Sequence, residues 1–80
     1  MTRDEIFRLT VEAIHEETGS DVPITAATTG SDVPGWDSLA HVRIVLSLGI
    51  KLNCEVPIDD TYQAANVGEL ADVAARAAGA

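Results

Sequence analysis

The 80-residue sequence has little that could cross-link a small domain. Cys54 is the only cysteine, so no disulfide can form within the chain. We interpret it as a small, partly buried apolar residue of a protein in a reducing compartment. His15 and His41 are far apart, and His15-Glu16-Glu17 lacks the spacing that directs several ligands at one metal ion. We therefore expect neither a disulfide nor a metal site.

Basic residues are also scarce, since five Lys and Arg stand against thirteen Asp and Glu, for a formal net charge of −8. A surface of this sign repels the phosphates of nucleic acids and favours docking to enzymes with basic patches. The charged N-terminus has no secretory signal, and no apolar run approaches the ~20 residues that span a bilayer. We therefore expect a cytoplasmic monomer that binds neither nucleic acid nor membrane.

The apolar residues recur with helical spacing, and the alternation typical of strands is absent. Thr2 and Glu5 have the spacing of a capping box, and Gly19 is a typical helix stop. The sequence thus predicts a first helix over residues 3–18. Its apolar stripe consists of Ile6, Phe7, Leu9, Val11, Ala13 and Ile14.

Residues 20–36 are rich in turn-forming residues and predict a long first loop. We expect three apolar side chains to hold this loop on the core: Val22, Ile24 and Trp36.

A second helix is predicted to begin at Asp37 or Ser38, either of which can cap it. One apolar stripe of this helix is formed by Leu39, Val42, Leu46 and Gly49, with Val45 and Leu52 close by. A glycine costs about 1 kcal/mol relative to alanine inside a helix, so the helix can fray, bend or end at Gly49. Asn53 offers an alternative stop.

Two further helices complete the prediction. Pro57 precedes a short third element near residues 59–64, which Asp59 or Asp60 could cap. Asn66 and Glu69 have N-cap and N3 spacing and start a last helix. Its inward face consists of Val67, Leu70, Val73, Ala74 and Ala77. The sequence therefore predicts one all-α domain over residues 1–80, a small four-helix bundle with three longer helices, a short third helix and a long first loop.

The segment Gly35-Trp36-Asp37-Ser38-Leu39 places a serine beside a carboxylate at the start of the second helix. Taken alone, the Asp-Ser pair predicts only a helix cap. The segment is superficially similar to Gly-Asp-Ser-Leu esterases, but Trp36 stands where they have glycine. A hydrolase also needs a base, an orienting acid and an oxyanion hole in one pocket, for which a small helical domain offers little room. We therefore expect no catalytic residues and no enzyme activity.

The motif Asp37-Ser38-Leu39, its position after a long loop and the chain length together resemble the acyl carrier protein family. Val56-Pro57 and Asn66-Val67 match the segments before the family's third and last helices. The resemblance implies that a phosphopantetheinyl transferase attaches 4'-phosphopantetheine from coenzyme A to Ser38. It also implies that Asp37 and Leu39 are recognised by the transferase, and that Val42 and Leu46 face inward.

The family resemblance further implies an acyl- or aminoacyl-loading enzyme and a downstream synthase or transferase as partners. Members that serve fatty-acid synthesis carry several acidic residues along helix two, whereas here Gly49-Ile50 stands where many have two glutamates. The candidate docking residues are His41, Val42, Arg43, Ile50 and Lys51.

We therefore predict an acyl carrier of polyketide, specialised fatty-acid or secondary-metabolite biosynthesis. One alternative is an aminoacyl or peptidyl carrier loaded by an adenylating enzyme. The other is a non-carrier helical adaptor in which Asp37 and Ser38 only cap a helix.

Overall fold

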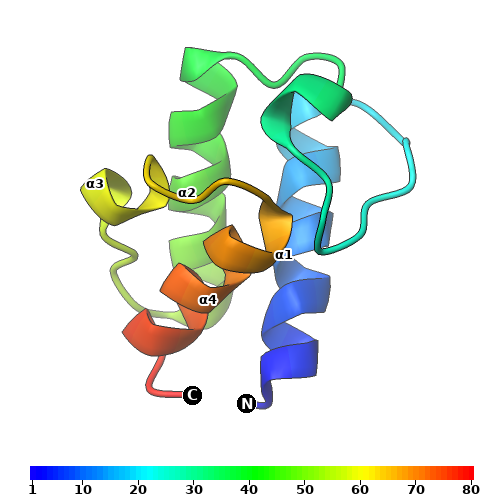
Figure 1. Ribbon diagram of the computed structural model, residues 1–80. Coiled ribbons are helices and arrows are strands. Elements are labelled where there is room, and N and C mark those ends of the chain that lie inside the picture. Colours follow the sequence, from blue (N-terminus) through cyan, green and yellow to red (C-terminus); the bar gives the residue numbers. More distant parts are fainter.

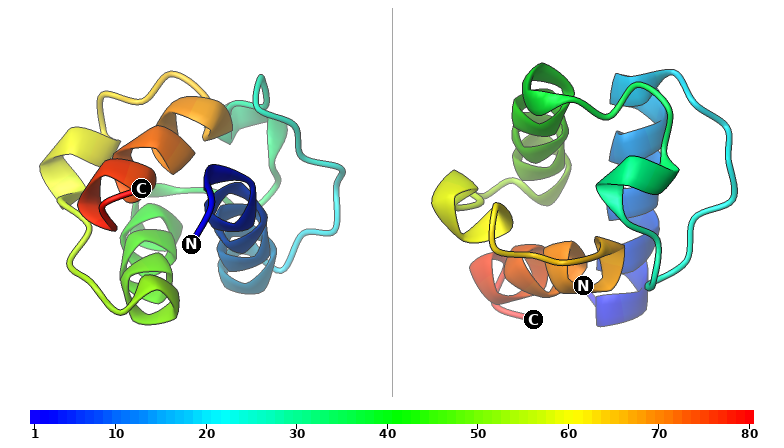
Figure 2. Two further views of the ribbon diagram at one scale, coloured as in Figure 1. Left: turned by 90° about the horizontal axis from the view of Figure 1, so that it is seen from below. Right: turned by 45° about the horizontal axis from the view of Figure 1, so that its top comes forward.

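The computed structural model describes all 80 residues and contains four α-helices, one 3-10 turn and no strand, so the predicted all-α fold is confirmed. The elements are α1 (Arg3–Thr18), η1 (Gly30–Asp32), α2 (Ser38–Leu52), α3 (Ile58–Thr61) and α4 (Val67–Ala77). α1 and α2 lie side by side in opposite directions, and α4 crosses them near the end that holds both termini (Figure 1). The short α3 lies against α2 and α4, away from α1 and the long first loop (Figure 2).

α1 has the predicted bounds because its two ends are fixed locally. The Thr2 hydroxyl accepts a hydrogen bond from the Glu5 amide at 3.1 Å, and the Glu5 carboxylate accepts one from the Thr2 amide at 2.9 Å. The bond from the Thr2 amide, followed by the Thr2 side chain, lowers the pKa of Glu5 because it stabilises the charged carboxylate. Gly19 ends the helix in the left-handed region, at φ 72°.

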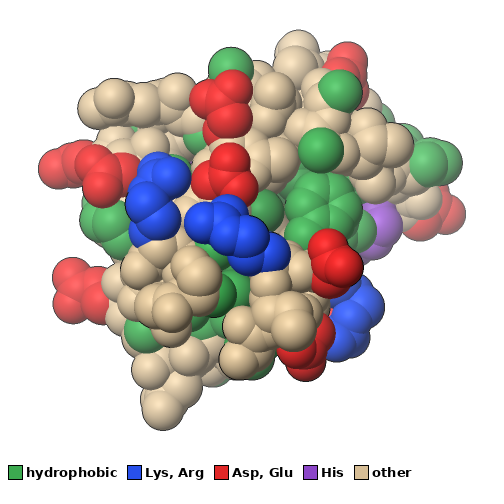
Figure 3. Space-filling view, turned by 60° about the horizontal axis from the view of Figure 1, so that its bottom comes forward, with side chains coloured by type: hydrophobic (Ala, Val, Ile, Leu, Met, Phe, Trp, Pro, Cys, Tyr) green, Lys and Arg blue, Asp and Glu red, His purple; other side chains and the backbone are tan.

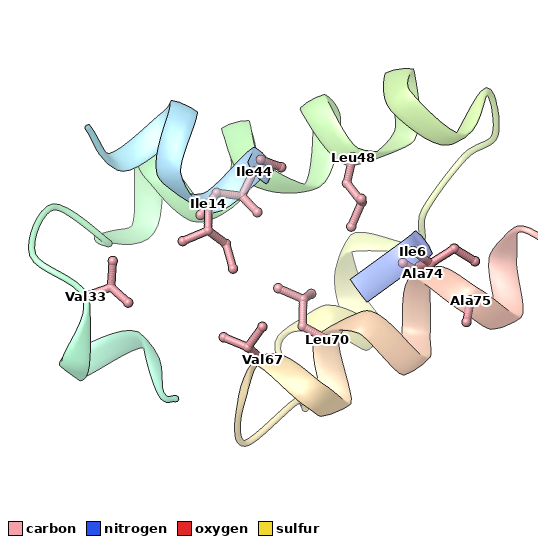
Figure 4. Packing of buried hydrophobic residues seen from close by; sticks show 10 residues of the cluster. Ile6, Ile14, Val33, Ile44, Leu48, Val67, Leu70, Ala74 and Ala75 are labelled. Atoms are coloured by element: carbon pink, nitrogen blue, oxygen red, sulfur yellow. The ribbon is translucent and has the colours of Figure 1, made fainter. Parts of the chain in front are cut away.

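The core lies where α1, α2 and α4 meet. Ile6 and Ile14 of α1, Ile44 and Leu48 of α2 and Leu70 of α4 are all 2% exposed or less. Figure 4 shows these side chains converging, with Val33 of the first loop and Val67 at the start of α4 closing one side. The expectation that the first loop is held on the core is also confirmed. The three loop side chains expected to pack against the core do so: Val22, Ile24 and Trp36.

The orientation of α2 differs from the sequence expectation. Its buried residues are Ala40, Ile44, Val45 and Leu48, whereas Leu39, Val42 and Leu46 are 58%, 36% and 63% exposed. The inward position implied for Val42 and Leu46 is therefore wrong. At about 100° per residue, positions 40, 44 and 48 and positions 39, 42 and 46 form stripes on nearly opposite sides of the helix. Both stripes are apolar, so spacing alone does not indicate which one is buried.

Gly49 neither breaks nor ends α2, which continues to Leu52. Asn53 ends the helix in the left-handed conformation, at φ 53°, which confirms it as the stop. A Cβ atom on Gly49 would lie only 2.8 Å from the Cys54 carbonyl oxygen. A glycine is thus required because the chain folds back over the last turn of the helix.

The last two helices form as predicted, but α3 covers residues 58–61 and not 59–64, and its cap differs. α3 begins at Ile58, with Pro57 at its N-cap and no side-chain capping bond, so Asp59 and Asp60 lie in its first turn instead of capping it. Acidic residues are favourable there because the helix N-terminus is partly positive. α4 starts as predicted, since the Asn66 side chain accepts a hydrogen bond from the Glu69 amide at 2.9 Å.

Charged side chains of both signs are mixed on the face that carries the termini (Figure 3). One ion pair that ties α1 to α4 is Arg3–Asp72, at 3.0 Å. None of the helices combines the length and the apolar character that a bilayer span requires.

Candidate functional site

The candidate site is the start of α2, at the end of the molecule opposite the two termini (Figure 1). Asp37 is the N-cap, and its carboxylate accepts a hydrogen bond from the Ala40 amide at 2.8 Å. Ser38 is the first helical residue and is exposed. Its hydroxyl makes no hydrogen bond within the chain. The capping role therefore falls to Asp37 alone, and the Ser38 oxygen points into solvent without an internal partner.

The backbone around Ser38 suits a negatively charged substituent. The amides of Ser38 and Leu39 have no acceptor within the chain, as is usual in the first turn of a helix. These free N–H groups and the helix dipole favour an anion at this position. Aside from Asp37, whose carboxylate is held by the Ala40 amide, the first turn of α2 contains no acidic residue. The residues present thus fit a phosphodiester on the Ser38 oxygen.

Of the candidate docking residues, Val42, Arg43 and Ile50 are exposed on α2, with Ile50 81% exposed. Val42 and Ile50 belong to a row of exposed apolar residues that we call the α2 ridge: Leu39, Val42, Leu46 and Ile50. Two hollows flank the C-terminal half of the α2 ridge, at Leu46 and Ile50. One, of about 570 Å³, extends towards Cys54 and Val56, and the other, of about 330 Å³, extends towards Glu17 and Arg43.

Arg43 makes no ion pair within the chain, whereas Lys51 makes two. The Lys51 ammonium lies 3.0 Å from the Glu12 carboxylate and 2.9 Å from that of Glu16, both on α1. Hydrogen bonds to Glu16 and Glu12 raise the pKa of Lys51. Lys51 thus joins α2 to α1, and Arg43 is the one cation of α2 without an internal partner.

His41 is half-buried in a cluster that the sequence did not indicate. Its ring stacks between Trp36 and Tyr62, with centroid distances of 6.0 and 4.6 Å. The Trp36 indole N–H donates to His41 Nδ1 at 3.2 Å, and His41 Nε2 lies 2.9 Å from the Thr61 hydroxyl. Burial lowers the pKa of His41. No sequence signal identifies this cluster, because Thr61 and Tyr62 reach His41 only through the packing of α3 on α2.

Next to this cluster is a hollow of about 210 Å³, lined by Trp36, His41 and Tyr62 and by residues that lead into α4. The remaining candidates for chemistry are isolated. Cys54 is a free, half-buried thiol, and no three His, Cys, Asp or Glu side chains come together to hold a metal ion.

Comparison with known proteins gives one informative relationship. No protein-family model and no solved structure matches the chain. A curated acyl carrier protein from Exiguobacterium sp. strain AT1b is 34% identical over 71 residues, which cover 88% of this chain and 90% of that protein. The match thus extends over most of both chains.

Proposed function

Because the chain belongs to the acyl carrier protein family, we propose that it carries acyl groups as thioesters on a 4'-phosphopantetheine arm attached to Ser38 Oγ. The observation that carries this assignment is the exposed, unbonded hydroxyl of Ser38 at the capped start of α2. When bound, the arm supplies the terminal thiol that holds the cargo. The protein is therefore a carrier and not a catalyst, and we expect it to act in the cytoplasm.

The residues around Ser38 present the attachment point and stabilise its charge. The bond from the Ala40 amide to Asp37 fixes the first turn, so the backbone at Ser38 has a defined position. The free amides of Ser38 and Leu39 stabilise the negative charge of a phosphodiester. A flexible tether at this site raises the local concentration of the cargo at a docked enzyme to the order of millimolar.

We assign docking to the α2 ridge, which begins beside Ser38 at Leu39 and extends to Ile50. α2 contains Arg43 and Lys51 but no Asp or Glu, on a molecule with a net charge of −8. A partner that approaches this helix therefore needs an apolar surface, with a carboxylate to meet Arg43. His41 and Lys51 are not part of this docking set, because both side chains are engaged within the chain.

The apolar and weakly basic character of α2 favours a specialised pathway, in polyketide, specialised fatty-acid or secondary-metabolite biosynthesis. The phosphopantetheinyl transferase, the loading enzyme and the downstream synthase or transferase would approach the same end of α2. An aminoacyl or peptidyl carrier remains the second candidate, because the same helix lacks the acidic residues of fatty-acid carriers. Family membership does not favour the non-carrier adaptor.

Incubation with coenzyme A, Mg²⁺ and a broad-specificity phosphopantetheinyl transferase tests the attachment site by intact-protein mass measurement. We expect a gain of one phosphopantetheine mass in the wild type and none in Ser38→Ala. Ser47→Ala, also on α2, is the matched control and should be modified as the wild type is. An unchanged wild-type mass, under conditions that modify a known carrier, contradicts the proposal.

A loading assay on the modified protein separates the two kinds of cargo. Acyl-transferring enzymes should charge the thiol of an acyl carrier, and adenylating enzymes with an amino acid should charge that of an aminoacyl carrier. If only adenylating enzymes charge the thiol, the protein is an aminoacyl or peptidyl carrier and not an acyl carrier.

A further inference from the structure

The hydrogen bonds of His41 determine which of its ring nitrogens carries the proton. The Trp36 indole N–H can only donate, so His41 Nδ1 must accept and carries no hydrogen. On the other side, the Thr61 hydroxyl donates its single hydrogen to the Ile58 carbonyl at 2.6 Å, so it can only accept from His41. Nε2 must therefore carry the hydrogen. The Trp36 bond requires the neutral ring, because Nδ1 carries no hydrogen, and the Thr61 bond agrees with the proton being on Nε2.

The hydrogen bonds that run from Trp36 through His41 and Thr61 to the Ile58 carbonyl, which we call the relay, join three separate segments. Trp36 belongs to the end of the first loop, His41 to the first turns of α2, and Thr61 and Ile58 to α3. Thr61 is 1% exposed, and the His41–Tyr62 stack lies beside it. α3 has only four residues and no side-chain cap, so it depends on such contacts for its position.

No charged group compensates a proton added to His41. Around the adjacent hollow, the first loop contributes Gly30 and Trp36, α3 and the residues after it contribute Thr61, Tyr62, Ala64, Ala65 and Asn66, and α4 contributes Leu70. Tyr62 is the only titratable group among them, and no Asp, Glu, Lys or Arg lines the hollow. His41 makes no ion pair. Asp37 and Asp60, which precede the cluster on α2 and α3, are exposed, and the Asp37 carboxylate is bonded to the Ala40 amide.

We propose that His41 is a pH-sensitive latch, which in its neutral form holds α3 against the start of α2 and on protonation of Nδ1 releases α3 and opens the hollow beside it. Protonation places an N–H of His41 against the N–H of Trp36, so this hydrogen bond is lost. No carboxylate pairs with His41 to compensate the added charge, which only the faces of the two aromatic rings favour. The latch is independent of any modification of Ser38, although it lies one helical turn from it.

The sign of the pH dependence follows from the lowered pKa of His41 in the folded chain, whose main cause is burial. Above the ordinary value of 6.5, folded and unfolded chains both hold a neutral ring, and the stability that the latch contributes is fully present. As the pH falls below 6.5, His41 of the unfolded chain gains a proton before His41 of the folded chain does. The stability that the latch contributes is therefore lost progressively, until the pH has passed through the folded pKa. Acidification below pH 6.5 should therefore loosen α3.

Trp36 is the only tryptophan, so its fluorescence reports directly on the latch. We expect the emission of the full chain to change with a midpoint below pH 6.5, and the backbone amides of α3 to lose hydrogen-exchange protection over the same range. Nitrogen NMR shifts of the wild-type ring should show the neutral form with its hydrogen on Nε2. A hydrogen on Nδ1, a midpoint at or above 6.5, or unchanged α3 protection through the transition overturns the proposal.

Two variants separate the latch from general packing. His41→Gln should abolish the fluorescence transition, whereas His15→Gln should retain it. The control is matched, because His15 Nε2 faces the Val22 carbonyl at 2.8 Å and can donate to it in either protonation state. Trp36→Phe should move the NMR midpoint of His41 up towards 6.5, because the donor that favours neutral Nδ1 is gone. A midpoint that stays in place or falls in Trp36→Phe contradicts the relay, even if His41→Gln fails to fold.

Discussion

At the scale of single residues, Asp37 combines a structural and a proposed recognition role that two substitutions can separate. Asp37→Ala removes the acceptor of the Ala40 amide and should cost about 1 kcal/mol of unfolding free energy. Asp37→Asn keeps an equally good cap but removes the charge. We expect urea unfolding of Asp37→Asn to match the wild type while its rate of phosphopantetheine attachment falls. An unchanged rate would limit Asp37 to capping.

At Gly49, we predict that alanine lowers stability, although helix propensity alone predicts that it raises stability. Replacing a glycine inside a helix by alanine normally stabilises by about 1 kcal/mol. Here the new Cβ atom would lie 2.8 Å from the Cys54 carbonyl oxygen, so the turn after α2 must move. We therefore expect Gly49→Ala to lower the thermal midpoint, while Ser47→Ala on the same helix leaves it equal or slightly higher. A stabilised Gly49→Ala would show that the turn at Cys54 yields without cost.

Residues whose structure is decided by near neighbours were predictable from the sequence. The caps at Thr2, Asn66 and Gly19 depend on hydrogen bonds within a few residues, and each is where the sequence placed it. The environment of His41 was not predictable, since Thr61 lies 20 positions away and reaches it through tertiary packing. The exposure of Ser38 follows from the cap, but its chemistry rests on the family relationship.

At the scale of elements, the existence of the helices followed from periodicity, and the bounds of α1 and the start of α4 followed from their capping residues. The orientation of α2 did not follow from the sequence. A helix with apolar stripes on opposite sides has no unique inward face until its neighbours are placed. α1 and α4 present the side chains that cover Ile44 and Leu48, and the α2 ridge is left in solvent. Because α2 has two apolar stripes, one can pack in the core while the other forms the proposed docking surface.

This assignment of faces predicts opposite outcomes for two leucines of α2. Leu48→Ala, in the core, should lower the free energy of unfolding by about 2–5 kcal/mol. Leu46→Ser, on the α2 ridge, should change it by no more than about 0.5 kcal/mol while weakening the binding of partner enzymes. Urea unfolding measures the first effect and titration with a loading enzyme the second. If Leu46→Ser unfolds the protein as readily as Leu48→Ala, the ridge belongs to the core after all.

At the scale of the whole molecule, the proposed attachment site and the chain termini occupy opposite ends (Figure 1). α1 supplies both carboxylates that bind Lys51 of α2 and the arginine that binds Asp72 of α4. α1 therefore makes ion pairs with both α2 and α4.

The net charge of −8 predicts how the stability of the whole chain depends on salt. Salt weakens both the repulsion among the excess carboxylates and the attraction within the few ion pairs. Exposed pairs contribute only about 0–1 kcal/mol each, and thirteen acidic residues against five basic ones make repulsion the larger effect. Raising NaCl from about 0.01 M to about 0.15 M shortens the screening length from ~30 Å to ~8 Å. We therefore expect the thermal unfolding midpoint to rise.

Lys51→Met provides the comparison for this salt effect, because it removes two attractions and one positive charge together. Its midpoint should lie below that of the wild type at low salt, and it should rise more steeply as NaCl is added. Calorimetry well above pH 6.5, where the unfolded chain also holds a neutral His41, keeps the latch out of the measurement. A wild-type midpoint that falls with salt would mean that the ion pairs of α1 outweigh the repulsion of the acidic surface.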